Sequence, residues 1–381
     1  MPTVTTVPVT RDGSDARADR WELRRAVWRV SKVKKLQTCG RAVRDDAVTL
    51  LVTTNGDERR AAAHGLVTCS SIWACPVCSA HIRQERASDL EAGLAKHRAQ
   101  GGGALLVTLT LRHEREDGLK DLLGALRTSW RRIQQSRAWK GELEALGVRG
   151  WVRAIEITYG ENGWHPHLHV LLLTAAEPTH GVRDRLSNWL TRRWLTQTAK
   201  HGFEGLPGIA VDVRRVADDP SAFERLAGYA TKGEHSHLEL ARADLKGGHR
   251  PLSYSCWDLL AWAHEGEAWA LHRWWEYEQA THRARAIEWS RGLREDLGLG
   301  KEREDGEITA DKEADDAETV EEVATLTERE WLTLCRAHLD YEAVKASLDG
   351  EPAVAAVLDA ARYVLESDRR DQIRVHGLRP G

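Results

Sequence analysis

Apolar positions follow two different spacings along the chain. Short apolar or β-branched runs predict strands at 47–54, 104–111, 151–159, 167–173 and 209–216. Helix-like spacing predicts helices over about 80–100, 118–140 and 179–201, and a further helix that begins at Ser221. Strands and helices in this order predict an α+β domain. It would have a mainly antiparallel central sheet with helices on one face.

Two of the predicted strands, 151–159 and 167–173, are expected to form a hairpin. Asn162-Gly163 lies between them, and this dipeptide between apolar runs is the strongest short-range hairpin signal. A two-residue loop at Asn162-Gly163 and a four-residue loop around it give the same pairing of the strands. The hairpin therefore predicts which side chains share a face of the sheet.

This pairing places Thr158 opposite His167 and Glu156 opposite His169. Residues two apart on a strand point to the same side, and directly opposed residues have Cβ atoms about 5 Å apart. Two neutral imidazoles and one carboxylate with open positions suit Mn²⁺ or Mg²⁺ acting as a Lewis acid on a phosphate. The alternative is that both histidines lie on the solvent face of a half-buried sheet.

Other histidines are less informative. His165 points to the same side but precedes Pro166 at the strand's beginning, so we expect it at the rim of the site. His235 and His237 repeat the two-residue spacing without a comparable strand. The hypothesis of a catalytic metal site therefore depends on the hairpin.

The first 15 residues, MPTVTTVPVTRDGSD, lack the apolar segment of a secretion signal, and no stretch reaches 18 apolar residues. We therefore expect a cytoplasmic protein without a membrane partner. Disulfides are rare in that compartment. The six cysteines are then expected to be metal ligands or core residues.

Four of the cysteines are candidates for a zinc site. The motif CPVC runs from Cys75 to Cys78, with Cys69 six residues upstream and Cys39 farther back. Four thiolates would close a tetrahedral structural zinc site that ties the N-terminal strands to the next helix. Free buried thiols are the alternative. The other two cysteines stand alone on predicted helices and are expected in the core.

The two ends of the chain are predicted to differ from the middle. Residues 1–35 are expected to be a flexible leader. Residues 301–326 are acidic and lack aromatic side chains, so they are expected to be a disordered linker. Thr327 and Glu330 have the spacing of a capping box, and a C-terminal helical hairpin is expected over 327–381.

The net charge of −3 conceals a difference between the body and the tail. Residues 1–300 hold 44 Lys and Arg against 37 Asp and Glu, whereas the remaining residues hold 11 against 21. A basic body suits a polyanionic partner, because local charge and not the sum sets the field. An ordinary solvated surface is the alternative.

Several segments, taken in order, resemble one family. LLVTLTLRH (105–113), HPHLHVLLL (165–173) and GYATK (228–232) resemble motifs of the HUH endonucleases, specifically plasmid rolling-circle replication initiators of the actinobacterial type. The cysteine segment and the helices after HRPLSYSCWDLLAWA are also similar to that family. The resemblance covers about 36–300. It implies a zinc-binding segment (36–100), a nuclease core with a ferredoxin- or RRM-like palm (101–240) and a Trp-rich helical region (241–300).

The resemblance also implies a mechanism. A tyrosine would attack the scissile phosphate of single-stranded origin DNA, forming a 5′-phosphotyrosine and freeing a 3′-hydroxyl for a polymerase. Tyr229 matches the position of that tyrosine, and Lys232 shares its helix face, where an ammonium favours the phenolate. Tyr159 and Tyr254 are the rival nucleophiles.

One position departs from the family pattern. Some relatives carry a carboxylate one helical turn before the tyrosine, where it activates water in termination. Arg225 occupies this position here, and Glu224 lies about 140° round the helix from Tyr229. Glu224 is a candidate for the hydrolytic base, and a second round of tyrosine attack is the alternative.

Arg112 and Arg214 are the candidate contacts to DNA phosphates nearest the active face. Tryptophans between 256 and 290 could stack bases, although such residues at helical spacing more often form core. A host helicase and a polymerase are the expected protein partners. Two other functions stay open. One is a relaxase or transposase of the same superfamily, and the other is a non-catalytic, zinc-containing DNA-binding regulator.

Overall fold

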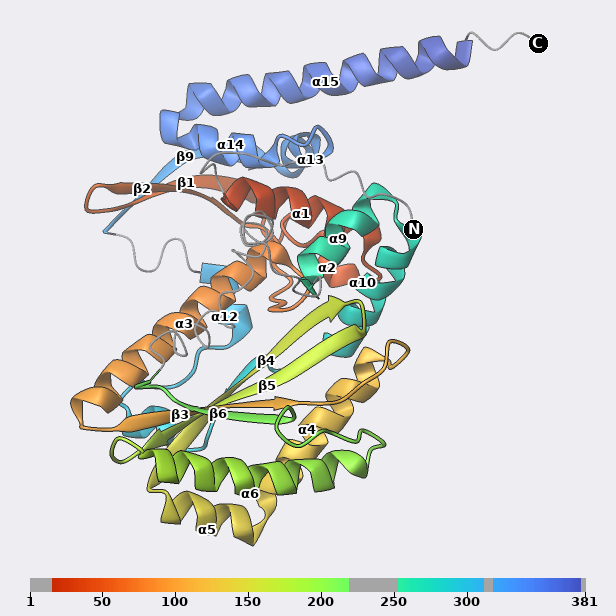
Figure 1. Ribbon diagram of the computed structural model, residues 1–381. Coiled ribbons are helices and arrows are strands. Elements are labelled where there is room, and N and C mark those ends of the chain that lie inside the picture. Colours follow the sequence, from red (N-terminus) through yellow and green to blue (C-terminus); the bar gives the residue numbers. More distant parts are fainter. Residues whose placement is uncertain (1–15, 219–252, 312–317, 378–381) are drawn as a thin grey trace.

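The computed structural model describes residues 16–218, 253–311 and 318–377. Its larger sheet comprises β3 (Gly103–Thr110), β4 (Val148–Gly160), β5 (Gly163–Thr174), β6 (Val211–Arg215), β7 (Ser253–Tyr254) and β8 (Ile287–Trp289). The strand order is β6-β3-β5-β4-β7, with β8 paired to β4, and every pairing is antiparallel. Three helices lie along one side of this sheet, namely α4 (Leu119–Gln135), α5 (Arg137–Ala145) and α6 (His180–Ala199) (Figure 1). The expected α+β architecture is confirmed.

Alternate residues of β5 are buried on the side that carries these helices. Leu168, Val170 and Leu172 are at most 1% exposed and share one core with Leu122 of α4 and Leu186 of α6. Burial of one such side chain stabilises the fold by about 2 kcal/mol. The other side of the sheet is covered in part by α3 (Pro76–Ala99) and the segment after β8 (Figure 1). On that side of β5, Leu171 and Leu173 are also buried, and His167 and His169 line a cavity.

The turn between β4 and β5 differs from the prediction. Gly160 pairs with Gly163, so the two central turn residues are Glu161 and Asn162. The predicted Asn-Gly turn needs a positive φ at both of its central residues. Only Gly163 adopts one here, at +82°, while Asn162 does not. The turn therefore lies one residue earlier, with Gly163 as the left-handed residue that follows it.

The predicted pairing of the two strands is consequently wrong by two residues. Glu156 lies opposite His167, and His169 lies opposite Ala154. Because side chains on a strand alternate with a period of two, a two-residue error leaves each side chain on the expected face. Glu156 still shares a face with both histidines.

The smaller sheet joins the two ends of the chain. It comprises β1 (Ala47–Asn55), β2 (Glu58–His64) and β9 (Thr319–Thr327), in the order β2-β1-β9. Four helical elements follow β9 and pack near this sheet (Figure 1), namely α13 (Glu328–Arg336), α14 (Asp340–Ala346), the 3-10 turn η1 (Ser347–Asp349) and α15 (Glu351–Gly377). The Thr327–Glu330 capping box is present. The region is thus more than the expected helical hairpin.

Two segments that were expected to be disordered are ordered where the structure describes them. In the predicted linker, α12 (Asp305–Asp311) is helical, and β9 pairs with β1 along its length. β9 escaped prediction because it is an edge strand whose side chains are mostly exposed, so no apolar alternation marks it. In the predicted leader, α1 (Ala16–Val30) is a helix whose Trp21 and Val27 are buried.

The remaining helices complete the description. The residues around the CPVC motif lie between α2 (Lys34–Thr38) and α3, and the Trp-rich region forms α9 (Cys256–Glu265), α10 (Ala268–Thr281) and α11 (Leu293–Asp296). Trp257 and Trp274 are core residues, as expected at helical spacing, whereas Trp269 is 45% exposed. No helix among the described residues is long and apolar enough to span a bilayer.

A buried charge cluster connects α1 to the C-terminal helices. Asp340, at the start of α14, accepts hydrogen bonds from Arg24 at 3.2 Å and from Arg25 at 3.0 Å. The Asp340 side chain is 0% exposed, and those of Arg24 and Arg25 are 4% and 12% exposed. Buried ions need a partner because their desolvation is costly. Asp340 therefore offsets the cost of placing Arg24 and Arg25 inside the fold.

We predict that Asp340→Ala lowers the free energy of unfolding by about 3–5 kcal/mol, because it leaves the buried Arg24 and the partly buried Arg25 without their carboxylate. Urea denaturation followed by circular dichroism measures the change. Asp359→Ala is the matched control, since Asp359 is 75% exposed and pairs with Arg362 at the surface. Equal effects of the two substitutions would contradict the role assigned to the buried cluster.

Candidate active site

The candidate site lies on the face of the large sheet that points away from α4, α5 and α6. His167 and His169 alternate with the buried Leu168 and Val170, so they point to this side. β5 lies between β3 and β4. Side chains from both neighbours therefore contact the histidines.

Hydroxyl and carboxylate groups hold the two imidazole rings. The Nδ1 atom of His169 lies 3.2 Å from Thr108 Oγ1, and that of His167 lies 3.3 Å from Thr110 Oγ1. The Nε2 atom of His169 lies 3.1 Å from Glu156 Oε2. A ring held at Nδ1 presents Nε2 in a fixed direction, which is how outer groups orient histidine ligands.

Burial keeps one of these rings neutral. It lowers the pKa of His167 to about 4, although the nearby Glu156 carboxylate acts in the opposite direction. Near neutral pH this imidazole is therefore uncharged, which is the form that binds a metal. His169 is 3% exposed. The solvent-face alternative, in which the histidines are simply hydrated, does not describe these side chains.

A cavity of about 320 Å³ opens at this point. Its lining consists of Leu106, Thr108, Glu156, His167, His169, Asp212 and Arg214. Asp212 was not among the predicted site residues. It lies opposite Thr108, which in turn lies opposite His169. The sequence shows that Asp212 alternates with apolar neighbours, but it does not show that β6 pairs with β3.

The structure brings one of the two predicted DNA-binding arginines to this cavity. Arg214 lines it and contacts Asp212, with Arg214 Nε 2.6 Å from Asp212 Oδ2. Arg112 is exposed in the loop after β3 and is not part of the lining. His165, expected at the rim, is partly buried and contacts His113, with Nδ1 to Nε2 at 2.9 Å.

The donor set fits a divalent cation in chemical type. His167, His169 and Glu156 offer two nitrogens and a carboxylate on one face, as Mn²⁺ or Mg²⁺ would require. Within the described residues, the group of His, Cys, Asp or Glu donors that all lie within 4.8 Å of one another is formed by four cysteines. His169 Nε2 and Glu156 Oε2 lie 3.1 Å apart, but with His167 they do not form a second group of three within that distance.

The rival tyrosines point away from the cavity. Tyr159 is three residues beyond Glu156 on β4, so it points to the opposite face, where it is 8% exposed and packs 5.0 Å from Trp164. Tyr254 pairs with Tyr159 and shares that face, and partial burial raises the pKa of Tyr254. Neither phenol is placed to attack a phosphate in the cavity. The predicted residues Tyr229, Lys232 and Glu224 lie outside the described residues.

The four predicted zinc ligands form one buried cluster. The Sγ atom of Cys39 lies 3.5 Å from that of Cys78 and 3.7 Å from that of Cys75, and Cys69 lies 3.7 Å from Cys78. Four sulfurs bound to zinc at about 2.3 Å would stand about 3.8 Å apart, so the spacing fits a tetrahedral site. The cluster could therefore hold a metal such as zinc.

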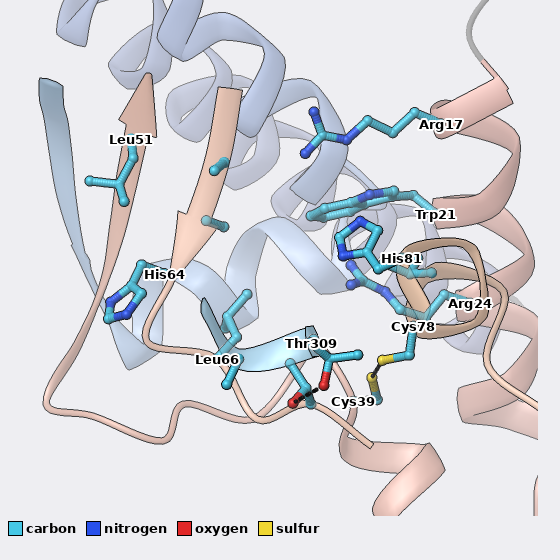
Figure 2. Close-up of a pocket in the computed structure, with 16 residues that line it drawn as sticks. Arg17, Trp21, Arg24, Cys39, Leu51, His64, Leu66, Cys78, His81 and Thr309 are labelled. Atoms are coloured by element: carbon cyan, nitrogen blue, oxygen red, sulfur yellow. Dashed lines mark hydrogen bonds between the residues drawn. The ribbon is translucent and has the colours of Figure 1, made fainter. Parts of the chain in front are cut away.

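The surroundings of the cluster favour a thiolate at Cys39, whereas they raise the pKa of Cys69 and Cys75. Hydrogen bonds from the other three thiols lower the pKa of Cys39, and the Arg24 guanidinium lowers it further. The backbone N–H of Cys69 donates to Cys39 Sγ at 3.3 Å. Figure 2 shows Cys39 and Cys78 at one end of a cavity that Arg17, Trp21 and Arg24 line from α1. Positive charge is thus available beside a negatively charged metal–thiolate group.

Comparison with known proteins identifies the family. A family model described as "Replication protein" matches residues 62–333. A relative named "Protein rep" from Streptomyces lividans is 33% identical over an aligned length of 377 residues. The match covers 82% of this chain and 82% of the relative. The chain belongs to the replication protein family. The family expected from the motifs is thereby confirmed.

A second relative is similar to a smaller part of this replication protein. A relative named "Neomycin resistance protein" from Streptomyces cyanogenus is 28% identical over 291 residues, covering 58% of this chain and 66% of the relative. No solved structure matches the chain.

We predict that the purified replication protein contains about one zinc ion per chain, and that Cys75→Ser abolishes zinc binding because it removes one of four ligands. Elemental analysis of the two proteins measures this. Cys335→Ser is the control. Cys335 is buried in the hydrophobic cluster that the small sheet forms with the C-terminal helices, so this substitution should leave the zinc content unchanged. A Cys75→Ser protein with full zinc content would show that the cluster is not the metal site.

Proposed function

We propose that this protein nicks single-stranded DNA at a specific origin site and transfers the strand through a covalent 5′-phosphotyrosine, so initiating rolling-circle replication of a plasmid. One observation carries the proposal. In a chain of the replication protein family, two imidazoles and a carboxylate face a cavity beside an arginine. Such a face suits phosphate chemistry better than structural support.

Tyr229 is the proposed nucleophile. Its phenolic oxygen would bond to the scissile phosphorus as the bond from phosphorus to the 3′-oxygen breaks. The DNA 3′-hydroxyl would then be free for a host polymerase to extend. Lys232 would favour the phenolate form of Tyr229. The positions of Tyr159 and Tyr254 on the opposite face of the sheet support Tyr229 by removing its rivals.

His167, His169 and Glu156 would hold Mn²⁺ or Mg²⁺. When bound, the ion would supply Lewis-acid stabilisation of the charge that develops on the phosphate. Thr108 and Thr110 fix the imidazole rings through Nδ1, so their Nε2 atoms are oriented before any ion binds. This orientation is the contribution of the chain itself.

Other parts of the chain would bind and support the DNA. Arg214 at the cavity, and Arg112 in the nearby loop, would contact phosphates. The zinc–cysteine cluster would have a structural role, since four thiolate ligands leave no open position for chemistry. A host helicase would supply the unwound strand. A covalent protein–DNA product would exclude the alternative of a non-catalytic DNA-binding regulator.

We predict that Tyr229→Phe forms no covalent adduct with an origin oligonucleotide in the presence of Mn²⁺, because the attacking oxygen is missing. Denaturing gel electrophoresis with labelled DNA detects the adduct. Tyr254→Phe, which removes a phenol on the opposite face, should retain adduct formation. An adduct that persists in Tyr229→Phe and disappears in Tyr254→Phe would assign the nucleophile to Tyr254.

We also predict that His169→Ala weakens Mn²⁺ binding by about 10-fold or more and slows nicking at saturating DNA, because it removes a ligand and the partner of Glu156. Calorimetric titration with Mn²⁺ measures the affinity. His165→Ala is the matched control, because His165 contacts His113 and not Glu156. Unchanged Mn²⁺ affinity in His169→Ala would contradict the proposed metal centre.

A further inference from the structure

We infer that Asp212 is the base that activates water when the DNA is released from the tyrosine. This inference rests on the proposed function, because it needs a covalent phosphotyrosine intermediate. Asp212 belongs to β6, outside the motifs that indicated the family. Its place on the sheet, its charged partner and its opening to solvent together support the role.

Asp212 lines the cavity on the same face of the sheet as the histidines, two strands away from His169. It lies opposite Thr108 on β3, and Thr108 lies opposite His169 on β5. Neighbouring strands are about 4.8 Å apart, so the backbones at Asp212 and His169 are separated by about 10 Å. The residue between them is a small threonine whose hydroxyl contacts His169. These side chains line one cavity of about 320 Å³, into which a phosphate group and a water molecule would fit.

Arg214 determines how the Asp212 carboxylate is presented. Its Nε atom lies 2.6 Å from Asp212 Oδ2, and both side chains line the cavity. A carboxylate has a second oxygen that can accept a hydrogen bond from water. Asp212 is 49% exposed, so water reaches it directly. The same arginine is charged and could contact a phosphate oxygen, which would bring the phosphorus and the water together.

Hydrolysis of the phosphotyrosine needs a base, and carboxylates are the candidates among the described residues of the cavity. In some relatives a carboxylate stands one turn before the tyrosine, but Arg225 has that position here. Among the described residues, two carboxylates line the cavity, Glu156 and Asp212. Glu156 is engaged with His169 Nε2 at 3.1 Å. Of these two described carboxylates Asp212 is the more accessible to water, because its side chain is 49% exposed and that of Glu156 is 18% exposed.

The proposed step is the hydrolysis of the phosphotyrosine. The water oxygen bonds to phosphorus while the bond from phosphorus to the Tyr229 oxygen breaks. One proton of the water passes to Asp212, and the departing phenolate takes up a proton from bulk water. Asp212 then returns its proton to bulk water, and the products are a DNA 5′-phosphate and free tyrosine.

Release from an isolated adduct tests the inference. An oligonucleotide with a short upstream segment loses that segment on nicking, and the labelled adduct can then be purified before water-dependent release is timed. We expect Asp212→Asn to slow release by about 100-fold or more, the size of a general-base contribution. Raising the pH should speed release more in Asp212→Asn than in the wild type, because hydroxide needs no base.

Controls separate this role from others. Asp218→Asn alters a surface carboxylate that pairs with Arg215 just after β6, and it should release DNA at the wild-type rate. Release from Asp212→Asn at the wild-type rate would overturn the inference while leaving the proposed function intact. Mn²⁺ affinity lowered in Asp212→Asn as in His169→Ala would make Asp212 a ligand and also overturn it. If the wild-type protein forms no adduct, the proposed function fails and the role of Asp212 falls with it.

Discussion

The hydrogen-bonded position of β5 between β3 and β4 is the constraint on which the site depends. Because side chains alternate along a strand, this pairing sends Leu168 and Val170 into the helical layer and His167 and His169 to the other face. A slip by one residue would exchange the two sets and place imidazoles in the core. The same hydrogen bonds that stabilise the sheet therefore determine which groups meet at the cavity.

The neighbouring strands then supply two different sets of side chains to the cavity. β3 supplies Thr108, which fixes the His169 ring, and β4 supplies Glu156 on the same side as the imidazoles. β6 adds Asp212 and Arg214 across the cavity. The side chains of β4 and β5 suit a cation, while β6 carries a carboxylate and a guanidinium that suit proton transfer and phosphate binding. No single strand contains both kinds of chemistry, so the activity we propose belongs to the assembled sheet.

The sequence predicted what depends on local pattern and missed what depends on contacts between distant segments. The two-faced strand and the shared face of Glu156 were predictable from the period of two. The register was wrong because it depends on the φ angle of Asn162, which the Asn-Gly pair does not determine. Asp212 was missed because the pairing of β6 with β3 is a tertiary contact.

The ends of the chain show the same limit. Arg24 of α1 lies in the segment that was expected to be a flexible leader, and its buried guanidinium group donates to Asp340, 316 residues away. β9 is polar and forms a strand because β1 offers its edge. The same Arg24 lowers the pKa of Cys39, so the cysteine cluster and the C-terminal helices share one charged residue. Neither contact leaves a periodic signal in the sequence.

The most direct test of the central claim is anomalous X-ray scattering at the manganese edge from crystals grown with Mn²⁺ and a single-stranded origin oligonucleotide. We predict one manganese peak within about 2.3 Å of an imidazole nitrogen of His167, an imidazole nitrogen of His169 and a carboxylate oxygen of Glu156. A manganese ion bound elsewhere on the chain, with these three side chains unligated, would contradict it.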